Sequence, residues 1–316
     1  MNAPSPSDAA ATPEISIVIP CRNEEANVEA IAAAAIAEVT KHAGSYEIVF
    51  IDNRSTDRTV ELVKSLCRDN PNVRLIVNSR NFGQMRSPTH AIYQTRGAAV
   101  IGLCADFQDP PEMIGEFISR WRAGAKIVLG VRKAEDSPLS VRIPRRLGYG
   151  LLNRLGDYAV IEGATGFGLY DRAVVDCLAG WNEPEPFFRG MLVESGYRLE
   201  TIPYERPPRA GGRSNNNLST SIDFALSAFA SSAKQWLRLP IYLSLFVAAL
   251  AGLALIAAIV LLAVGRSPWG MLGVFAAALG FAGAFFFLGL IGDQVRVISE
   301  RTRNVPLVVE EERINF

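Results

Sequence analysis

Two long runs without a charged side chain most constrain what this chain can fold into. The first extends from Leu239 to Gly265, and the second from Gly270 to Gly292. Each run is longer than the roughly 20 apolar residues that a helix needs to cross a bilayer. Two buried helices of a soluble core are the alternative, but uninterrupted runs of this length are rare in soluble folds. We therefore expect two transmembrane helices, joined by a short loop.

Basic residues flank the two runs and predict their orientation. Lys234 and Arg238 precede the first run, further arginines follow the second run from Arg296 onward, and only Arg266 lies between the runs. Since positive charge accumulates on the cytoplasmic side of a membrane, both ends of this hairpin are expected in the cytoplasm. The first 13 residues have no basic start and no apolar core, so they do not form a signal peptide and are expected to be a disordered tail.

The segment before the first run has the pattern of an amphipathic helix. Between Leu218 and Trp236, apolar residues recur at helical spacing, and serines with a few charged residues lie off that stripe. Its position next to a span favours a helix that lies at the membrane surface, with Trp236 at the level of the lipid headgroups. An ordinary amphipathic helix packed on the preceding domain remains the alternative.

The first 210 residues alternate between strand and helix patterns. The β-rich runs "EISIVIP", "YEIVFIDN", "VRLIVNS" and "AAVIGLCAD" are separated by helical segments. This alternation implies parallel pairing in a doubly wound α/β domain. No G-x-G-x-x-G or G-x-x-x-x-G-K motif is present, so neither a dinucleotide fold nor a P-loop is supported.

Charge is balanced at 32 basic and 32 acidic residues, which implies no nucleic-acid partner. Four widely spaced cysteines fit a reduced compartment.

Polar clusters follow four of these expected strands. They are Asn23-Glu24-Glu25, Asp52-Asn53, Ser79-Arg80-Asn81 and Asp106-Gln108-Asp109. In open α/β sheets, ligands bind beyond the carboxyl ends of the strands. A single cluster after a strand is only a turn, whereas four in succession predict a polar crevice along one edge of the sheet.

Several segments together resemble glycosyltransferase family 2, and most closely its polyprenyl-phosphate branch. They are "SIVIPCRNEEANV", "IVFIDNRSTDRTVE", "GLCADFQDPPE", "PFFRG" and "PYERPPRAGG", in this order, followed by the two apolar runs. The resemblance implies a GT-A fold and inverting transfer of a sugar from a nucleotide sugar, UDP-sugar favoured over GDP-sugar, to polyprenyl phosphate. It also implies Mg²⁺ or Mn²⁺ as cofactor, a homo-tetramer, and a multi-pass protein of the bacterial inner (cytoplasmic) membrane with its catalytic domain in the cytoplasm.

The resemblance assigns roles to individual residues on the donor side. Asp106 matches the last aspartate of the family's metal motif, and Gln108 matches the glutamine that follows. A carboxylate and an amide oxygen suit Mg²⁺, which prefers one or two protein oxygens completed by phosphate and water. The expected donor-binding residues are Pro20, Asn23, Glu24, Asp52 and Asp106, with Asp52 facing the base or ribose.

On the acceptor side, the same resemblance nominates arginines. A phosphate monoester is already anionic at neutral pH, so the protein must mainly position two anions and neutralise the leaving diphosphate. The fixed fork of arginine suits the acceptor phosphate. The expected acceptor-binding residues are Arg132, Arg145 and Arg146, with Arg189 and Arg209 in second rank. Asp106 and the first three arginines are the expected catalytic residues.

This chain departs from the family pattern at several positions near the expected site. Cys104 stands at the first aspartate of the metal motif, and we expect it to be a buried strand residue. Asn53 replaces the second of two aspartates, and Gly166 and Gly168 remove two charges from another motif. These changes keep open a metal-free site, and a non-catalytic membrane scaffold. A processive polysaccharide synthase is a further alternative, although "KQWLRL" lacks the spacing of its Q-x-x-R-W segment.

The expected architecture is therefore a GT-A type doubly wound α/β domain followed by an interfacial helix and a two-helix transmembrane hairpin. The boundaries are a tail over residues 1–13, the glycosyltransferase domain over 14–212, the amphipathic region over 213–238, the two spans within 239–292, and a cytoplasmic tail over 293–316.

Overall fold

The computed structural model describes residues 12–133, 161–207 and 305–316, with single positions between 273 and 302. The expected interfacial helix and most of both apolar runs therefore lie outside the described residues. Within the described part of the chain, none of the helices is both long enough and apolar enough to cross a bilayer.

The first four strands form the parallel half of the sheet. They are β1 (Ile15–Cys21), β2 (Tyr46–Asp52), β3 (Val73–Asn78) and β4 (Ala99–Gly102). β1 pairs in parallel with β2 and with β4, and β2 pairs in parallel with β3. Nearly every residue in them is buried, as expected of parallel strands covered by helices on both faces. The parallel pairing predicted from the alternation is thus confirmed.

Three further strands extend the sheet beyond β4. They are β5 (Ile127–Arg132), β6 (Ala164–Asp171) and β7 (Leu199–Tyr204). β6 runs antiparallel to both β4 and β5, whereas β7 is parallel to β5. Because β6 reverses the direction once on each side, β5 and β7 run in the same direction as β1 to β4. Six strands therefore have their carboxyl ends at one edge of the sheet, which we call the carboxyl edge.

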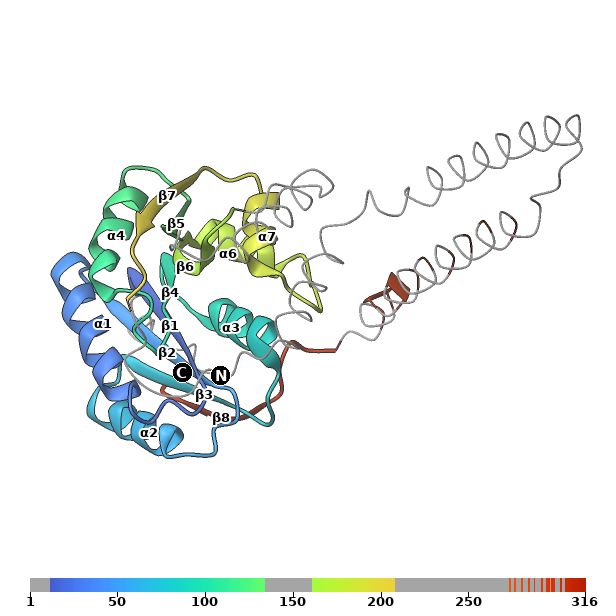
Figure 1. Ribbon diagram of the computed structural model, residues 1–316. Helices are drawn as coiled ribbons and strands as arrows, with labels where there is room; N and C mark the ends of the chain where they lie inside the picture. Colours follow the sequence, from blue (N-terminus) through green and yellow to red (C-terminus); the bar gives the residue numbers. More distant parts are fainter. Residues whose placement is uncertain are drawn as a thin grey trace, which may run out of the picture.

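Helices cover both faces of the sheet (Figure 1). One face carries α1 (Val28–His42), α2 (Thr59–Asp69), the 3-10 turn η1 (Pro111–Met113) and α4 (Ile114–Arg122). The other face carries α3 (Gly83–Gln94), α6 (Arg172–Ala179) and α7 (Phe188–Glu194). Each face has its own cluster of buried aliphatic and aromatic side chains, so the sheet lies between two apolar layers.

The last strand comes from the segment, residues 293–316, that we expected to be a cytoplasmic tail. β8 (Glu310–Ile314) pairs antiparallel with β3, so that the sheet has the order β7-β5-β6-β4-β1-β2-β3-β8. Figure 1 shows this strand, in red, beside β3. It covers the edge of β3, whose backbone groups would otherwise offer a template for pairing with another chain.

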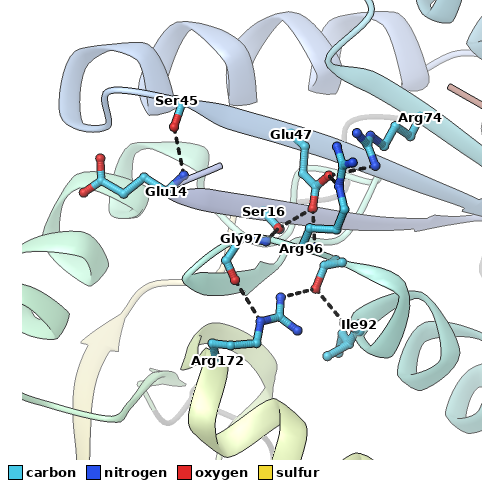
Figure 2. Close-up of polar contacts among 10 residues, drawn as sticks. Glu14, Ser16, Ser45, Glu47, Arg74, Ile92, Arg96, Gly97 and Arg172 are labelled. Carbon is cyan, nitrogen blue, oxygen red and sulfur yellow. Dashed lines mark hydrogen bonds and ion pairs between the residues drawn. The ribbon is translucent and has the colours of Figure 1, made fainter. Parts of the chain in front are cut away.

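At the opposite edge of the sheet, where the parallel strands begin, lies a buried polar network centred on Glu47 (Figure 2). The carboxylate of Glu47 accepts hydrogen bonds from the Ser16 hydroxyl at 2.6 Å and the Arg96 backbone N–H at 2.7 Å. The guanidinium of Arg74 lies 3.1 Å from the other carboxylate oxygen. Gly97 donates its N–H to Ser16, and a Cβ there would meet the Ser16 hydroxyl at 2.5 Å. We call this end of the sheet the amino edge.

Candidate active site

The loops after β1 and β2 are locked together at the carboxyl edge. Asn23 has a positive φ of 56°, which asparagine tolerates better than most residues. Its side-chain oxygen accepts the Thr56 backbone N–H at 2.8 Å, and its own N–H donates to the Ser55 hydroxyl at 2.9 Å. The local function of Asn23 is therefore to join the two loops, at the place where the sequence predicts a donor-binding residue.

Glu24 and Pro20 also lie at this edge. Glu24 is buried, its N–H donates to the Thr59 hydroxyl at 2.9 Å, and its carboxylate accepts from the Asn27 amide at 2.7 Å. These contacts fix the residues that precede α1. Pro20 is half-buried near the end of β1, opposite Ile51 of β2. Both predicted donor residues are thus at the expected edge, and their contact with a nucleotide stays a prediction.

Asp52, the last residue of β2, is buried and folds back on its own loop. Its carboxylate accepts the backbone N–H of Ser55 at 2.9 Å and also the Ser55 hydroxyl. Burial raises the pKa of Asp52, and the two hydrogen bonds from Ser55 oppose that shift. The carboxylate therefore shapes the loop, and its expected contact with a base or ribose stays a prediction.

Asn53 is the centre of a network that explains why this position is an asparagine. Its amide group donates to the Asn81 side-chain oxygen at 2.7 Å and to the Gly83 carbonyl at 3.1 Å. Its oxygen accepts from the Asn78 amide at 3.2 Å and from the Phe82 N–H at 2.8 Å. An aspartate has no donors for the first two contacts. The departure at Asn53 is therefore matched by its surroundings, which need both the donors and the acceptor of an amide.

The acidic turn after β4 carries the two expected metal ligands. Phe107 has a positive φ of 59°, and the turn brings the Gln108 N–H to 3.2 Å from the Asp106 carboxylate. Both side chains are half-buried. Within the described residues no three His, Cys, Asp or Glu side chains gather around a metal position. The donor set of one carboxylate and one amide oxygen nevertheless fits a hard cation that also binds a diphosphate.

Cys104 is not the buried strand residue that we expected. β4 ends at Gly102, two residues earlier than Cys104, and the cysteine is exposed. The prediction of a longer strand was wrong because the chain turns away from β1 after Leu103, whose N–H makes the last bond to Val18 at 3.0 Å. The Cys104 N–H then donates to the Asp109 carboxylate at 3.3 Å.

A buried pair, Asp109 and Tyr204, links the acidic turn to Arg132. The Tyr204 hydroxyl donates to the Asp109 carboxylate at 2.9 Å, and the Arg132 Nε approaches the same hydroxyl at 3.4 Å. Burial raises the pKa of Asp109, and burial with the nearby Asp109 charge raises the pKa of Tyr204 to about 12. The structure thereby brings together one expected metal turn and one expected acceptor residue, at the ends of β4 and β5.

Two glycines of β6 have different reasons for lacking a charge. Gly168 lies between β4 and β5, and a Cβ there would meet the Val128 carbonyl at 2.3 Å, so no side chain fits. Gly166 has open space around it but a φ of 95°, which favours glycine. Nearby, Arg189 donates to the Ala164 carbonyl at 2.6 Å. The other expected acceptor arginines, Arg145, Arg146 and Arg209, lie outside the described residues.

The described candidate residues after β1, β2, β4 and β5 lie at the carboxyl edge, as the sequence predicts, but the sequence did not indicate how they are joined. It grouped Asp109 with the acidic turn without giving it a role, and it did not nominate Tyr204, although "PYERPP" was among the family-like segments. Both are buried polar residues that meet from distant strands. The contact depends on the order β7-β5-β6-β4 in the sheet, which brings the end of β7 near the turn after β4.

Comparison with known proteins gives the class to which this fold and site belong. The sequence profile described as "Glycosyl transferase family 2" matches residues 16–179. The chain belongs to this family and is a glycosyltransferase.

Individual relatives narrow the comparison further. An uncharacterized glycosyltransferase of Synechocystis sp., sll0501, is 30% identical over 302 residues, which cover 94% of each chain. A bactoprenol glucosyl transferase of Shigella phage SfX is 31% identical, over 75% of this chain and 78% of that protein. A crystal structure of glucosyl-3-phosphoglycerate synthase from Mycobacterium tuberculosis overlaps with a TM-score of 0.48 at 18% identity, covering 70% of this chain and 77% of that one. Of the two sequence relatives, the phage protein has bactoprenol in its name, and the Synechocystis protein is described as a glycosyltransferase without a stated acceptor.

Proposed function

We propose that this glycosyltransferase moves a sugar, with inversion, from a UDP-sugar to polyprenyl phosphate at the cytoplasmic face of a bacterial inner membrane. The observation that carries the proposal is that one buried pair of residues contacts both the expected cation-binding turn and an expected phosphate-binding arginine. Asp109 and Tyr204 contact both the turn that bears Asp106 and the guanidinium of Arg132. A hard-cation site beside an arginine suits a diphosphate donor that meets a phosphate acceptor. The bactoprenol glucosyl transferase relative supports a polyprenyl acceptor.

The reaction requires the protein to position the donor and the acceptor more than it requires a strong general base. An oxygen of the acceptor phosphate attacks C1 of the sugar, the bond from C1 to the diphosphate breaks, and the nucleoside diphosphate leaves with the electron pair. The acceptor is already anionic, so no proton has to be removed by the protein. Arg132 would hold the acceptor phosphate through its paired N–H groups. A divalent cation, Mg²⁺ or Mn²⁺, bound by Asp106 and Gln108 would neutralise the charge of the diphosphate.

The membrane part of the proposal depends on the sequence. Residues 239–292 contain the two uncharged runs, and a polyprenyl acceptor resides in a bilayer. We propose that the runs form the transmembrane hairpin and that the site faces the cytoplasm, where nucleotide sugars are present. Arg145, Arg146 and Arg209 would add to the acceptor site, and assembly as a homo-tetramer belongs to the same proposal.

The test is a transfer assay on the full chain in detergent. Radiolabelled UDP- and GDP-sugars are supplied with undecaprenyl phosphate and Mg²⁺ or Mn²⁺, and label that extracts with lipid is counted. We expect one UDP-sugar to label the lipid, with no label when either the metal or the lipid is omitted. A long labelled polymer would identify a processive synthase instead. Absence of lipid-linked label with every donor would reject the proposed acceptor.

A further inference from the structure

The C-terminal strand carries an irregularity at the carboxyl edge of the sheet. In the pairing of β8 with β3, Val77 lies opposite Glu312 and Asn78 lies opposite Glu310, so the register shifts by one residue. Glu311 is therefore the extra residue of a β-bulge. Such a bulge interrupts the alternation of side chains and re-aims the residue that it contains.

The ion pairs of β8 show the effect of the bulge. Glu310 pairs with His90 of α3 at 2.6 Å, and Glu312 pairs with Lys64 of α2 at 2.5 Å. In an unbroken strand, residues two apart point to the same face. Here α3 and α2 cover opposite faces of the sheet (Figure 1), so the two glutamates diverge. The bulge leaves Glu311 between them, and its carboxylate forms an ion pair with Arg54 in the loop after β2.

Arg54 occupies an unusual backbone conformation within the loop that holds Asp52. Its φ is 65°, which a long side chain adopts only where the surrounding structure enforces it. The next residue, Ser55, binds the Asp52 carboxylate through its N–H and also accepts the Asn23 N–H. The left-handed residue is thus the point at which the chain turns so that Ser55 reaches both partners. A contact that holds Arg54 also holds this loop.

We propose that Arg54 and Glu311 are a positioning pair, through which the C-terminal strand keeps the loop from Asp52 to Thr56 ready for the nucleotide part of the donor. The inference rests on the proposed function for the identity of the donor, and on the geometry alone for the coupling. We call residues 52–56 the donor loop. Because β8 follows the two apolar runs in sequence, it ties the donor loop to the part of the chain that comes after them. Both side chains are about half exposed, at 51% and 52%, so the expected effect is several-fold and not larger.

The chain offers a matched control on the same strand. Glu311→Lys breaks the pair with the donor loop, whereas Glu312→Lys breaks a similar half-exposed pair that reaches α2. UDP affinity is measured by calorimetry on the full chain in detergent, and protection of the Ser55 and Thr56 amides by hydrogen exchange. We expect Glu311→Lys to weaken UDP binding about two- to fivefold and to speed exchange at both amides. Glu312→Lys should do neither, and the exchanged pair Arg54→Glu with Glu311→Arg should restore both readouts.

Equal effects of the two single variants on exchange and affinity would overturn the proposal, because they would show a general loosening of β8. Unchanged exchange in Glu311→Lys would also overturn it. If the parent protein does not bind UDP, the donor class is wrong, and amide exchange still decides the role of the pair. Two substitutions of Arg54 separate backbone strain from the ion pair. Arg54→Ala removes the pair and keeps a strained positive φ, whereas Arg54→Gly removes both the pair and the strain. Amide exchange in the loop should therefore be slower in Arg54→Gly than in Arg54→Ala.

Discussion

The two edges of the sheet carry similar carboxylate and guanidinium groups that differ in how deeply they are buried. At the amino edge, Glu47 is 2% exposed, accepts hydrogen bonds from two groups and lies beside a buried arginine. At the carboxyl edge, Asp106 and Gln108 are half-buried on a turn, and Arg132 stands at the end of its strand. The first arrangement stabilises the junction of three strands. The second leaves side chains where a ligand can reach them, so burial distinguishes the carboxylate of Glu47 from that of Asp106, for which we propose a role in catalysis.

The largest expected effect is on activity alone. Asp106→Ala should lower transfer by at least about a hundredfold, because it removes the carboxylate expected to hold the cation against the diphosphate. The unfolding midpoint should change little, since the side chain is half-buried on a turn. Transfer and thermal unfolding are measured on the same preparation, with Glu116→Ala on the surface of α4 as the control. Transfer at the parental rate would remove Asp106 from the site.

The opposite result is expected at the amino edge. Glu47→Ala leaves the buried guanidinium of Arg74 without its counter-charge, which should lower the free energy of unfolding by about 3–5 kcal/mol. Urea unfolding measures the loss, with Glu38→Ala, which breaks an exposed pair with Lys41, as the control expected to stay within about 1 kcal/mol. The fraction that remains folded should transfer sugar at the parental rate. A catalytic defect in that fraction would contradict the proposal that the amino edge is structural and the carboxyl edge is catalytic.

Asn53 tests a part of the carboxyl edge that resembles the amino edge, because it is a buried polar side chain held by several contacts. Asn53→Asp removes the donors to Asn81 and Gly83 and places a carboxylate against two oxygens, at a cost of about 1–3 kcal/mol. Asn81 cannot simply rotate its amide to compensate, because its oxygen also accepts the Gly83 N–H at 2.9 Å. Both stability and UDP affinity should fall. Asn72→Asp adds the same charge on an exposed turn and should be neutral; equal behaviour of the two variants would refute the network.

The smallest expected effect depends on pH. Asp171 lies at the amino edge and accepts from Trp121 at 2.8 Å and from Lys126 at 2.9 Å. Burial opposes the shift, but these hydrogen bonds hold its pKa below the usual 3.8. Asp171→Asn should cost about 1 kcal/mol at neutral pH, because Lys126 is partly screened by solvent. Since the folded pKa is lowered, this difference should be full above about pH 4 and vanish as pH falls through the folded pKa. A constant difference would show that the charge contributes nothing.

The sequence predicts the parallel strands and the edge at which the candidate site residues gather, because both follow from local patterns. The strand and helix patterns around β1, β2 and β3 lie in consecutive residues, and a polar cluster follows each of these strands directly in the sequence. The end of β4 was missed because apolar residues continue past Gly102 into the turn. The contact of Tyr204 with Asp109 and the four bonds of Asn53 depend on segments that meet only in the folded chain. No local pattern specifies such contacts.

β8 pairs with β3 across more than 230 residues, and its "EEERI" sequence is a weak strand signal. That separation also determines when the sheet can be completed. During synthesis, β1 to β7 have left the ribosome before Glu310 is added, so the edge of β3 stays unpaired until β8 has been made. Bare edges of this kind pair with other chains. A protein whose synthesis stops before residue 310 would therefore retain the acidic turn and Arg132 but expose a strand ready to join a second nascent chain.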